Sequence, residues 1–423
     1  MRWFAALIVY RILLPLLFLA AFPGWLVKML RRGGFGTLLG ERAAVYGEPV
    51  DFELSGAVHL HAVSVGEVML ALKLIRAWRV REPERRFVLA TGTATGHAVA
   101  TAAGIPGLRV TYAPLDFPSM VRRYLDRFEP RRIVLVEGEA WPHLLIECRR
   151  RGIPVSLVNA RMSPRSARRY RKYAAWLRPL FRMLEAVAVQ EAEDMEIWKL
   201  LGVRPERIHH TGSLKFDPAG GARPEKRPEF QEMLDAFGEN RRVVLAASTH
   251  TGEDAWIANV IREAASDALP VIVPRHAERR SEVRAELEKA GFGVVLRSAF
   301  HPPAERALLV VDSTGELRDW TAHADVVVIG KSFLATGGQN PAEAILARKP
   351  LVCGPHMENF QPLISQLVAA KACLSADGPD ALREAIRRAL DPAVANNMID
   401  QAAKVLATHE GATGRILCLL GAD

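Results

Sequence analysis

The chain has 423 residues, of which 49% are hydrophobic, and this is enough apolar material for two folded domains and argues against disorder. The net charge of +9 suits anionic partners, but it does not choose among nucleic acid, anionic lipid and phosphorylated sugars. The four cysteines form no CxxC pair, which predicts reduced thiols in a cytosolic setting, without a disulfide framework or structural zinc.

The N-terminal segment is almost wholly apolar over residues 3–27, and a basic cluster ending at Arg32 follows it. About twenty apolar residues suffice to cross a bilayer and flanking cations mark the cytoplasmic side, so residues 1–32 are predicted to be a membrane anchor. A cleaved signal peptide is disfavoured because no small-x-small cleavage site follows. A buried core helix is an alternative. Because Arg11 and Pro15 interrupt the stretch, a helix lying in the membrane interface also stays open.

Beyond the anchor, short β-branched runs alternate with amphipathic helical segments, which predicts parallel sheets built from β-α-β units. A stretch rich in Gly, Pro and charge interrupts this alternation at 217–228 and is predicted to be a linker. We therefore expect two Rossmann-like domains, at 33–216 and 229–423, with ligands bound in a cleft between them, beyond the carboxyl ends of the strands. The predicted strands are 57–65, 87–91, 110–113, 133–137, 155–159 and 186–190, then 243–248, 271–274, 294–296, 308–312, 326–330 and 350–354.

The first candidate for chemistry is Glu67. The segment from His61 to Glu67 has the pattern of a strand, a tight turn and the start of a helix. A carboxylate in the first helical turn lies next to the positive end of the helix dipole, which favours its ionised form. Glu67 is thus either a charge that only stabilises the helix start or a general base that takes a proton from an attacking hydroxyl. The residues of this segment leave both interpretations open.

Other charged positions in the first half also follow predicted strands. Glu137 and Glu139 come at and just after the end of the strand at 133–137, and one of these two acids is expected to face the cleft. Lys215 lies where the first half passes into the linker, which places it at the cleft by topology.

A dense basic stretch that also contains Trp176 and Phe181 follows at 165–182. Its simplest interpretation is a solvated basic helix. On a membrane-anchored protein it also suits an anionic glycolipid or the bilayer surface. Nucleic acid would tolerate such a stretch, but no nucleic-acid-binding motif accompanies it, so nucleic acid is not expected as a partner. The cations are Arg165, Arg168, Arg169, Arg171, Lys172, Arg178 and Arg182.

Three strand ends in the second half carry groups that a nucleotide needs. Arg275 ends an apolar strand with a cation suited to phosphate. Residues 312–317 end another strand and open a helix whose free amides could hold an anion. In 337–343, glycines allow close backbone approach, Pro341 pre-sets a helix start, and Glu343 is placed to accept hydrogen bonds from ribose hydroxyls.

The motifs of several other nucleotide-dependent classes are missing from the sequence. It has neither a Walker P-loop nor a GxGxxG turn, which disfavours an ATPase and an NAD enzyme. It also lacks the Asp-x-Asp pair that commonly holds Mg²⁺ or Mn²⁺ on a nucleotide sugar. A metal-free transferase with two Rossmann-like halves therefore fits best.

Together these motifs resemble those of the bacterial 3-deoxy-D-manno-octulosonic acid (Kdo) transferases of lipopolysaccharide biosynthesis. The resemblance covers nearly the whole chain and keeps the motifs in order. It implies a GT-B fold and an inverting, metal-independent transfer of Kdo from CMP-Kdo to a lipid A precursor, lipid IVA, with no cofactor. It also implies that the enzyme works on the cytoplasmic face of the bacterial inner membrane. The matching segments are 61–67, 159–161, 212–217, 312–317, 337–343 and 354–360.

The same resemblance assigns roles to individual residues. It implies that Glu67 is the catalytic base and that Glu137 and Lys215 assist the transition state. The CMP contacts that it implies are Pro274, Arg275, Thr314, Gly315, Glu316, Asn340, Pro341, Ala342 and Glu343.

The chain departs from the family pattern at a few positions. Lys331 stands where the family usually has glycine, Gln339 where it usually has histidine, and Gly138 and Ala140 change the motif after Glu137. These changes leave the reaction class standing but bear on donor preference and on the number of Kdo units added. Two alternatives remain: a GT-B transferase that uses another nucleotide sugar, such as a UDP-sugar, and a membrane-bound glycolipid-binding protein that has lost catalysis.

Overall fold

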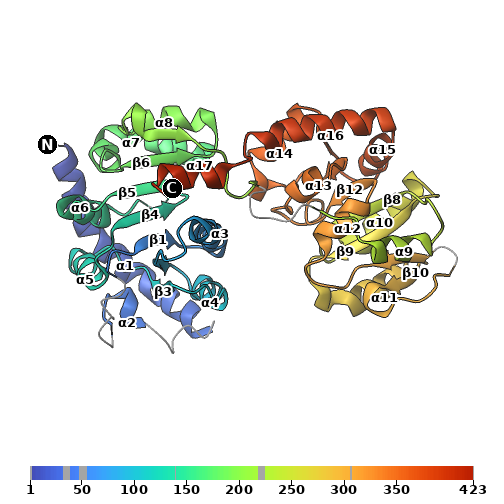
Figure 1. Ribbon diagram of the computed structural model, residues 1–423, viewed down its shortest axis with the longest axis horizontal. Coiled ribbons are helices and arrows are strands. Elements are labelled where there is room, and N and C mark those ends of the chain that lie inside the picture. The colour runs from blue at the N-terminus through green and yellow to red at the C-terminus, as the bar shows by residue number, and fades with distance from the viewer. Residues whose placement is uncertain are drawn as a thin grey trace. The chain divides into compact units, whose positions relative to one another are not determined.

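The computed structural model describes residues 2–31, 39–46, 55–138, 140–217, 224–304 and 307–422. Arg32, Glu139 and the central part of the predicted linker, 218–223, lie outside these residues. The chain forms two compact units, one made of residues 1–220 with 409–423 and the other of residues 221–408 (Figure 1).

Each unit is built on a seven-stranded sheet. The strand order is β3-β2-β1-β4-β5-β6-β7 in the first unit and β10-β11-β9-β8-β12-β13-β14 in the second, and every described pairing is parallel. The order 3-2-1-4-5 in the first sheet is that of a Rossmann fold. The prediction of two Rossmann-like sheets is therefore confirmed.

Five of the seven strands of the first unit are almost completely buried, because helices cover both faces of a parallel sheet, whereas the edge strands at 108–112 and 208–210 are partly exposed. Its strands are β1 (Val58–Ala62), β2 (Phe87–Thr91), β3 (Leu108–Tyr112), β4 (Arg132–Val136), β5 (Val155–Ala160), β6 (Ala186–Val189) and β7 (Ile208–His210). Its helices are α1 (Arg2–Arg31), α2 (Leu39–Arg42), α3 (Val65–Arg81), α4 (Ala94–Ala102), α5 (Pro118–Phe128), α6 (Pro142–Arg151), α7 (Pro164–Phe181), α8 (Met195–Leu200) and α17 (Ala412–Leu419).

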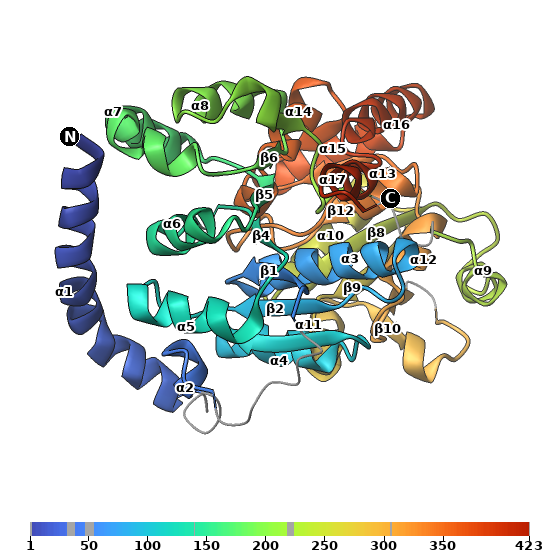
Figure 2. The same ribbon diagram turned by 60° about the vertical axis from the view of Figure 1, so that its left-hand side comes forward.

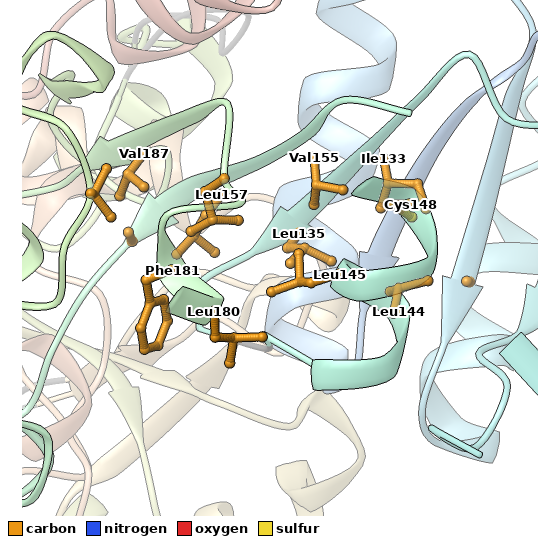
Figure 3. Packing of buried hydrophobic residues seen from close by; sticks show 14 of the residues in the cluster. Ile133, Leu135, Leu144, Leu145, Cys148, Val155, Leu157, Leu180, Phe181 and Val187 are labelled. Carbon is orange, nitrogen blue, oxygen red and sulfur yellow. The ribbon is translucent and has the colours of Figure 1, made fainter. Parts of the chain in front are cut away.

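Prolines begin three of the helices that build the core of the first unit. Proline at the first helical turn begins α5, α6 and α7, where its missing N–H is not needed. The side chains of α6 and α7 then pack on β4, β5 and β6 (Figure 3). The labelled core residues are Ile133, Leu135, Leu144, Leu145, Cys148, Val155, Leu157, Leu180, Phe181 and Val187.

The second unit repeats this architecture with its own core. Its strands are β8 (Val243–Thr249), β9 (Leu269–Pro274), β10 (Gly293–Leu296), β11 (Ala307–Val310), β12 (Val326–Ile329), β13 (Leu351–Cys353) and β14 (Cys373–Ser375). Its helices are α9 (Pro228–Asp235), α10 (Glu253–Ala264), α11 (Arg280–Lys289), α12 (Leu317–His323), α13 (Ala342–Leu346), α14 (Leu363–Ala369), α15 (Pro379–Ala389) and α16 (Pro392–Ala407).

The apolar N-terminal segment is the long helix α1. Its window Phe4–Gly24 has a mean hydropathy of 2.3 and, by length and composition, could cross a membrane. None of this window is buried inside the protein, which excludes the alternative of a core helix. Pro15 and Pro23 lie inside the helix without ending it.

Candidate active site

Glu67 lies at the start of α3, just after the carboxyl end of β1, as the sequence predicts. Ser64 is the N-cap, and its Oγ accepts a hydrogen bond from the Glu67 N–H at 3.2 Å. In return, Glu67 Oε1 accepts from Ser64 Oγ at 2.8 Å and Oε2 accepts from the Val63 N–H at 2.8 Å. This reciprocal arrangement is close to a capping box, so the carboxylate has a local structural role whatever else it does. It also fixes the direction of the carboxylate, and each oxygen keeps a second lone pair for a substrate hydroxyl.

Glu137 follows β4 and shares its surroundings with the other predicted catalytic residues. Its φ of 65° is unusual for a residue with a side chain and holds the carboxyl at the edge of the sheet. Oε1 accepts from Asn159 Nδ2 at 3.4 Å, and Oε2 lies 3.6 Å from Arg161 Nε. Burial raises the pKa of Glu137 and the charge of Glu67 raises it further, whereas Arg161 and Lys215 oppose the shift. Glu137 is therefore close enough to Glu67 and to Lys215 to interact electrostatically with each of them.

Lys215 lies in a turn after β7, next to the same carboxyl group. Desolvation lowers the pKa of its ammonium, repulsion from Arg161 adds to this, and Glu137 opposes the shift. The preceding backbone is fixed from the sheet side, since the Leu214 N–H donates to Asn159 Oδ1 at 2.8 Å and Lys73 Nζ donates to the Leu214 carbonyl at 2.8 Å. The turn that carries Lys215 is thus tied to the end of β5, where the Glu137 partners are.

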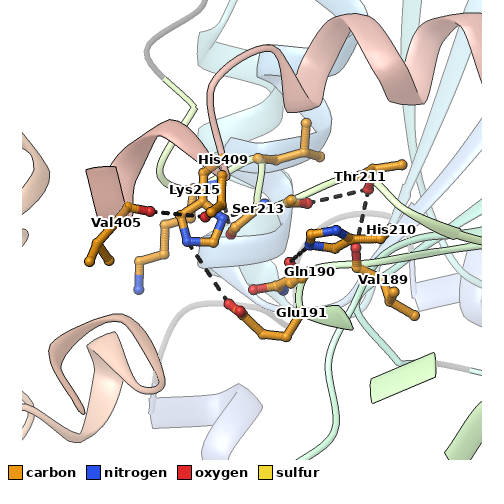
Figure 4. Close-up of polar contacts among 12 residues, drawn as sticks. Val189, Gln190, Glu191, His210, Thr211, Ser213, Lys215, Val405 and His409 are labelled. Atoms are coloured by element: carbon orange, nitrogen blue, oxygen red, sulfur yellow. Dashed lines mark hydrogen bonds and ion pairs between the residues drawn. The ribbon is translucent and has the colours of Figure 1, made fainter. Parts of the chain in front are cut away.

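The C-terminal segment that belongs to the first unit holds the other side of this turn (Figure 4). The Ser213 N–H donates to Nδ1 of the buried His409 at 3.2 Å. The Asp217 carboxylate accepts from the backbone N–H groups of Gly411 at 3.0 Å and Thr413 at 2.6 Å, and so caps the start of α17. Arg415 donates twice to the carbonyl of Thr211. Sequence reasoning missed these contacts, because no local pattern links residues 409–415 to 211–217.

In the second unit, a pocket of about 170 Å³ opens at the carboxyl ends of the strands. Three residues predicted to contact CMP line it: Arg275 after β9, and Asn340 and Glu343 at the start of α13. Gln339, one of the departures from the family pattern, also lines it. The remaining lining residues are Ala247, Ser248, Leu317, Thr321, Val327, Ile329 and Ala344.

Glu343 has the chemical environment of a ligand-binding carboxyl. Its Oε2 is buried and has no hydrogen-bond partner among the described residues. Burial raises the pKa of Glu343, and Arg318 and Arg275 oppose the shift. A buried acceptor without a donor is costly, so this oxygen suits a ligand that brings a hydroxyl or an amine. Asn340 supports the position of Glu343, because its Oδ1 accepts from the Ala342 N–H at 3.1 Å.

The other predicted donor contacts lie beside this pocket rather than in its wall. Pro274 precedes Arg275, and Pro341 and Ala342 stand between Asn340 and Glu343. Thr314, Gly315 and Glu316 form the bend that leads into α12, whose Leu317 and Thr321 do line the pocket. Gly315 has a φ of 86°, and Glu316 accepts from Ser313 Oγ and, at 3.3 Å, from Arg297.

Ser248 and Thr321 are pocket residues that sequence reasoning missed. The signal available for Ser248 is a polar Ser-Thr-His run at the end of an apolar strand. Ser248 has a φ of 58°, and a Cβ added to Gly330 on the neighbouring strand end would lie 2.6 Å from Thr249 Cα, so backbones pack tightly there. Lys331 follows with a φ of 55°, a conformation that favours glycine. Its N–H donates to Glu253 Oε2 at 2.5 Å.

Within the described ranges, no group of three or more His, Cys, Asp or Glu side chains is placed to hold a metal ion.

The fold has relatives among solved structures. UDP-GlcNAc 2-epimerase from Neisseria meningitidis, bound to UDP-GlcNAc, matches with a TM-score of 0.57 at 11% identity and covers 87% of this chain and 100% of that chain. The C-terminal CMP-Kdo binding domain of WaaA from Acinetobacter baumannii is 28% identical and covers 42% of this chain and 93% of that domain, with a TM-score of 0.37. Two Rossmann-like units with a pocket at the carboxyl ends of the strands define a GT-B fold.

Sequence relatives identify the family. The 3-Deoxy-D-manno-octulosonic-acid transferase (kdotransferase) family matches residues 37–218. The 3-deoxy-D-manno-octulosonic acid transferase of Bordetella pertussis is 35% identical over 412 residues, which cover 93% of this chain and 94% of the relative. The chain therefore belongs to the Kdo transferase family and is a glycosyltransferase.

Proposed function

We propose that this enzyme transfers Kdo from CMP-Kdo to a hydroxyl of lipid IVA, a lipid A precursor, with inversion at the anomeric carbon and without a metal ion. The observation that carries the proposal is the cluster of Glu67, Glu137 and Lys215 at the carboxyl edge of the first sheet, in a chain of this family. The first unit then serves the acceptor, the second binds the donor, and 217–228 links them.

In the proposed reaction Glu67 takes the proton of the acceptor hydroxyl. The acceptor oxygen forms a bond to the anomeric carbon of Kdo while the bond from that carbon to the phosphate oxygen breaks, and the bonding electron pair leaves with CMP. A single displacement of this kind inverts the anomeric carbon. The capping bonds to Ser64 and Val63 hold the base in one direction before the substrate arrives, which reduces the reorganisation needed during reaction.

Glu137 and Lys215 assist this step in the proposal. Lys215 supplies positive charge against the negative charge that develops in the transition state. Glu137 and Arg161 tune that charge, because the carboxylate favours the protonated amine and the guanidinium disfavours it.

For the donor, we propose that Glu343 and Asn340 bind the nucleoside part of CMP and that Arg275 binds its phosphate. The buried Glu343 oxygen without a partner supports this, since a ribose hydroxyl would supply the missing donor. The bend at Thr314, Gly315 and Glu316 would complete the site from the side of α12.

For location, we propose the cytoplasmic face of the bacterial inner membrane. The exposed apolar helix α1 and the exposed cations of α7 support this proposal.

The test is an assay of the purified full chain with CMP-Kdo and lipid IVA, in the presence and absence of EDTA. We expect Kdo-modified lipid and free CMP in equal amounts, with the same rate in both conditions. Melting temperatures with CMP and with UDP serve as the donor test, because only the true ligand stabilises the protein by mass action. Stabilisation by UDP alone would favour a UDP-sugar donor. Lipid binding without turnover would leave a glycolipid-binding protein.

A further inference from the structure

Helix α1 is docked on the first unit through polar side chains in the middle of its apolar window. Tyr10 donates its hydroxyl hydrogen to Asp116 Oδ2 at 2.8 Å, and Arg11 Nε donates to His143 Nε2 at 3.3 Å. Asp116 is buried and also accepts from the backbone N–H groups of His143 and Leu144, both at 2.9 Å, so it is a fixed part of the start of α6. Tyr10 therefore contacts a buried carboxylate that is itself held in place by hydrogen bonds, rather than a mobile surface side chain.

A second contact lies two turns further along the helix. The ring of Phe18 packs edge to face on Phe117, just before α5, with a centroid distance of 5.9 Å. Together with Leu7 and Leu14, Tyr10 and Phe18 are half-buried positions spaced three or four residues apart, which is one face of a helix. Figure 2 shows α1 running past α7, α6 and α5, so the helix lies along the unit over much of its length.

The opposite face of α1 is apolar and uncovered. Phe4 and Leu19 are 70% and 66% exposed, and Ile8, Ile12 and Leu16 are each more than half exposed. An exposed apolar surface of this kind is unfavourable in water, so this face of α1 is expected to be covered by an apolar partner.

The contacts on the docked face of α1 determine whether the helix can span a membrane or only lie in its surface. In a helix that spans the bilayer from Phe4 to Gly24, Tyr10 and Arg11 would lie about 10 Å inside the apolar window, at 1.5 Å per residue. Asp116 and His143, which contact these side chains, would then also have to lie in the hydrocarbon. The backbone at the start of α6 would have to lie there with them. Charged side chains are costly in that environment, and irregular backbone exposed to lipid does not occur there. The observed contacts and a spanning helix are therefore incompatible.

We propose that α1 lies in the plane of the membrane, in one leaflet, with its exposed apolar face toward the acyl chains and its N-terminus on the same side as the catalytic units. The inference rests on the membrane location proposed above. Charge also supports a membrane as the partner of this face. Helix α1 packs against α7, whose exposed face carries Arg168, Arg169 and Arg171. No ion pair is found for these three cations within the described ranges. They would meet anionic headgroups while α1 enters the leaflet.

The test uses the full chain with a hydrophilic, protease-cleavable epitope placed before Met1. The protein is reconstituted with vesicles of phosphatidylethanolamine and phosphatidylglycerol, and protease is added outside. An impermeant maleimide on the exposed Cys418 counts the molecules whose catalytic units face outward, and the other three cysteines are buried. We expect the epitope to be removed from every outward-facing molecule that floats with the vesicles. An Arg168→Ala, Arg169→Ala, Arg171→Ala variant should float less than the wild type at low salt, and its flotation should depend less on added salt, with the epitope still cleaved.

An epitope that stays protected until detergent is added would overturn the in-plane helix and show that α1 spans the bilayer. A full chain that does not float with the vesicles would instead overturn the proposed membrane location itself.

Discussion

The Ser213 N–H and Nδ1 of His409 are joined by a 3.2 Å hydrogen bond, although 196 positions separate the two residues. Burial lowers the pKa of His409 to about 4, so the ring is neutral near pH 7 and its Nδ1 can accept. Through this bond the C-terminal segment holds the turn that carries Lys215, two residues further on.

Replacing His409 by Ala should therefore leave the buried Ser213 N–H without an acceptor, at a cost of about 1–3 kcal/mol in the free energy of unfolding. We expect kcat to fall about tenfold, because Lys215 is no longer held, while CMP affinity stays unchanged. His409→Gln, which offers a side-chain acceptor, should recover part of the turnover. His301→Ala, at an exposed position in the second unit, is the control. Unchanged kcat in His409→Ala would show that the contact does not position Lys215.

Glu137→Gln should change how stability depends on pH. Because the folded-state pKa of Glu137 is raised, the folded chain holds this proton at pH values where the unfolded chain has lost it. The wild type should thus lose free energy of unfolding relative to the variant as pH rises from the ordinary glutamate pKa through the raised one. Chemical denaturation of both proteins from pH 4 to pH 8 measures the difference. Parallel curves would mean that Glu137 is ionised as readily in the folded chain as in the unfolded one.

Glu343→Gln tests the donor pocket. The substitution keeps the shape of the side chain but removes the charge and one acceptor, so the CMP dissociation constant should rise about tenfold, the effect of one charge-assisted hydrogen bond. Calorimetric titration with CMP measures it, and Glu384→Gln, on the exposed face of α15, is the matched control. Equal CMP affinity in the two variants would move the nucleoside site away from Glu343.

Lys331→Gly separates backbone strain from charge. Lys331 and Lys371 both have a φ of 55°, so glycine at either position should raise the free energy of unfolding by up to about 1 kcal/mol. Only Lys331 lies near the pocket, two residues after Ile329, and we expect only its replacement to weaken CMP binding, because a cation is removed. Equal CMP affinity in both variants would exclude Lys331 from donor recognition.

Much of the fold can be predicted from the sequence, because short β-branched runs alternate clearly with amphipathic helical segments. The strand predicted at 87–91 coincides with β2, and that at 243–248 ends one residue before β8 does. The strands β7 and β14 were missed, because polar residues interrupt the apolar run that marks the equally short β13. Glu67 was placed correctly in the first turn of a helix because a strand, a small residue and a glycine precede it.

The missed parts of the site depend on contacts that are distant in sequence. His409 looks like any histidine in a helical C-terminus until the structure brings it to Ser213. Ser248 and Thr321 line the pocket as small hydroxyl residues on a buried strand and a buried helix, where the sequence pattern is the same for a core position and a binding wall. Arg11 was visible as an interruption in an apolar run, but its partner His143 was not, and neither was the contact of Tyr10 with Asp116.

Glu67→Gln tests the central claim most directly. The amide oxygen can still accept from the Val63 N–H, and the amide nitrogen can donate to Ser64 Oγ instead of accepting from it. The side chain cannot take the acceptor proton, so the variant should melt close to the wild type and bind CMP normally. Its kcat for Kdo transfer should fall by at least about a hundredfold, as expected for the loss of a general base. Ser64→Ala is the complementary variant, because it breaks both hydrogen bonds between Ser64 and Glu67 and keeps the carboxylate. It should lower the melting temperature, while its kcat falls much less than that of Glu67→Gln. Turnover and melting temperature measured on the same preparations decide the matter. Near-normal kcat in Glu67→Gln would contradict the account and leave Glu67 with the capping role alone.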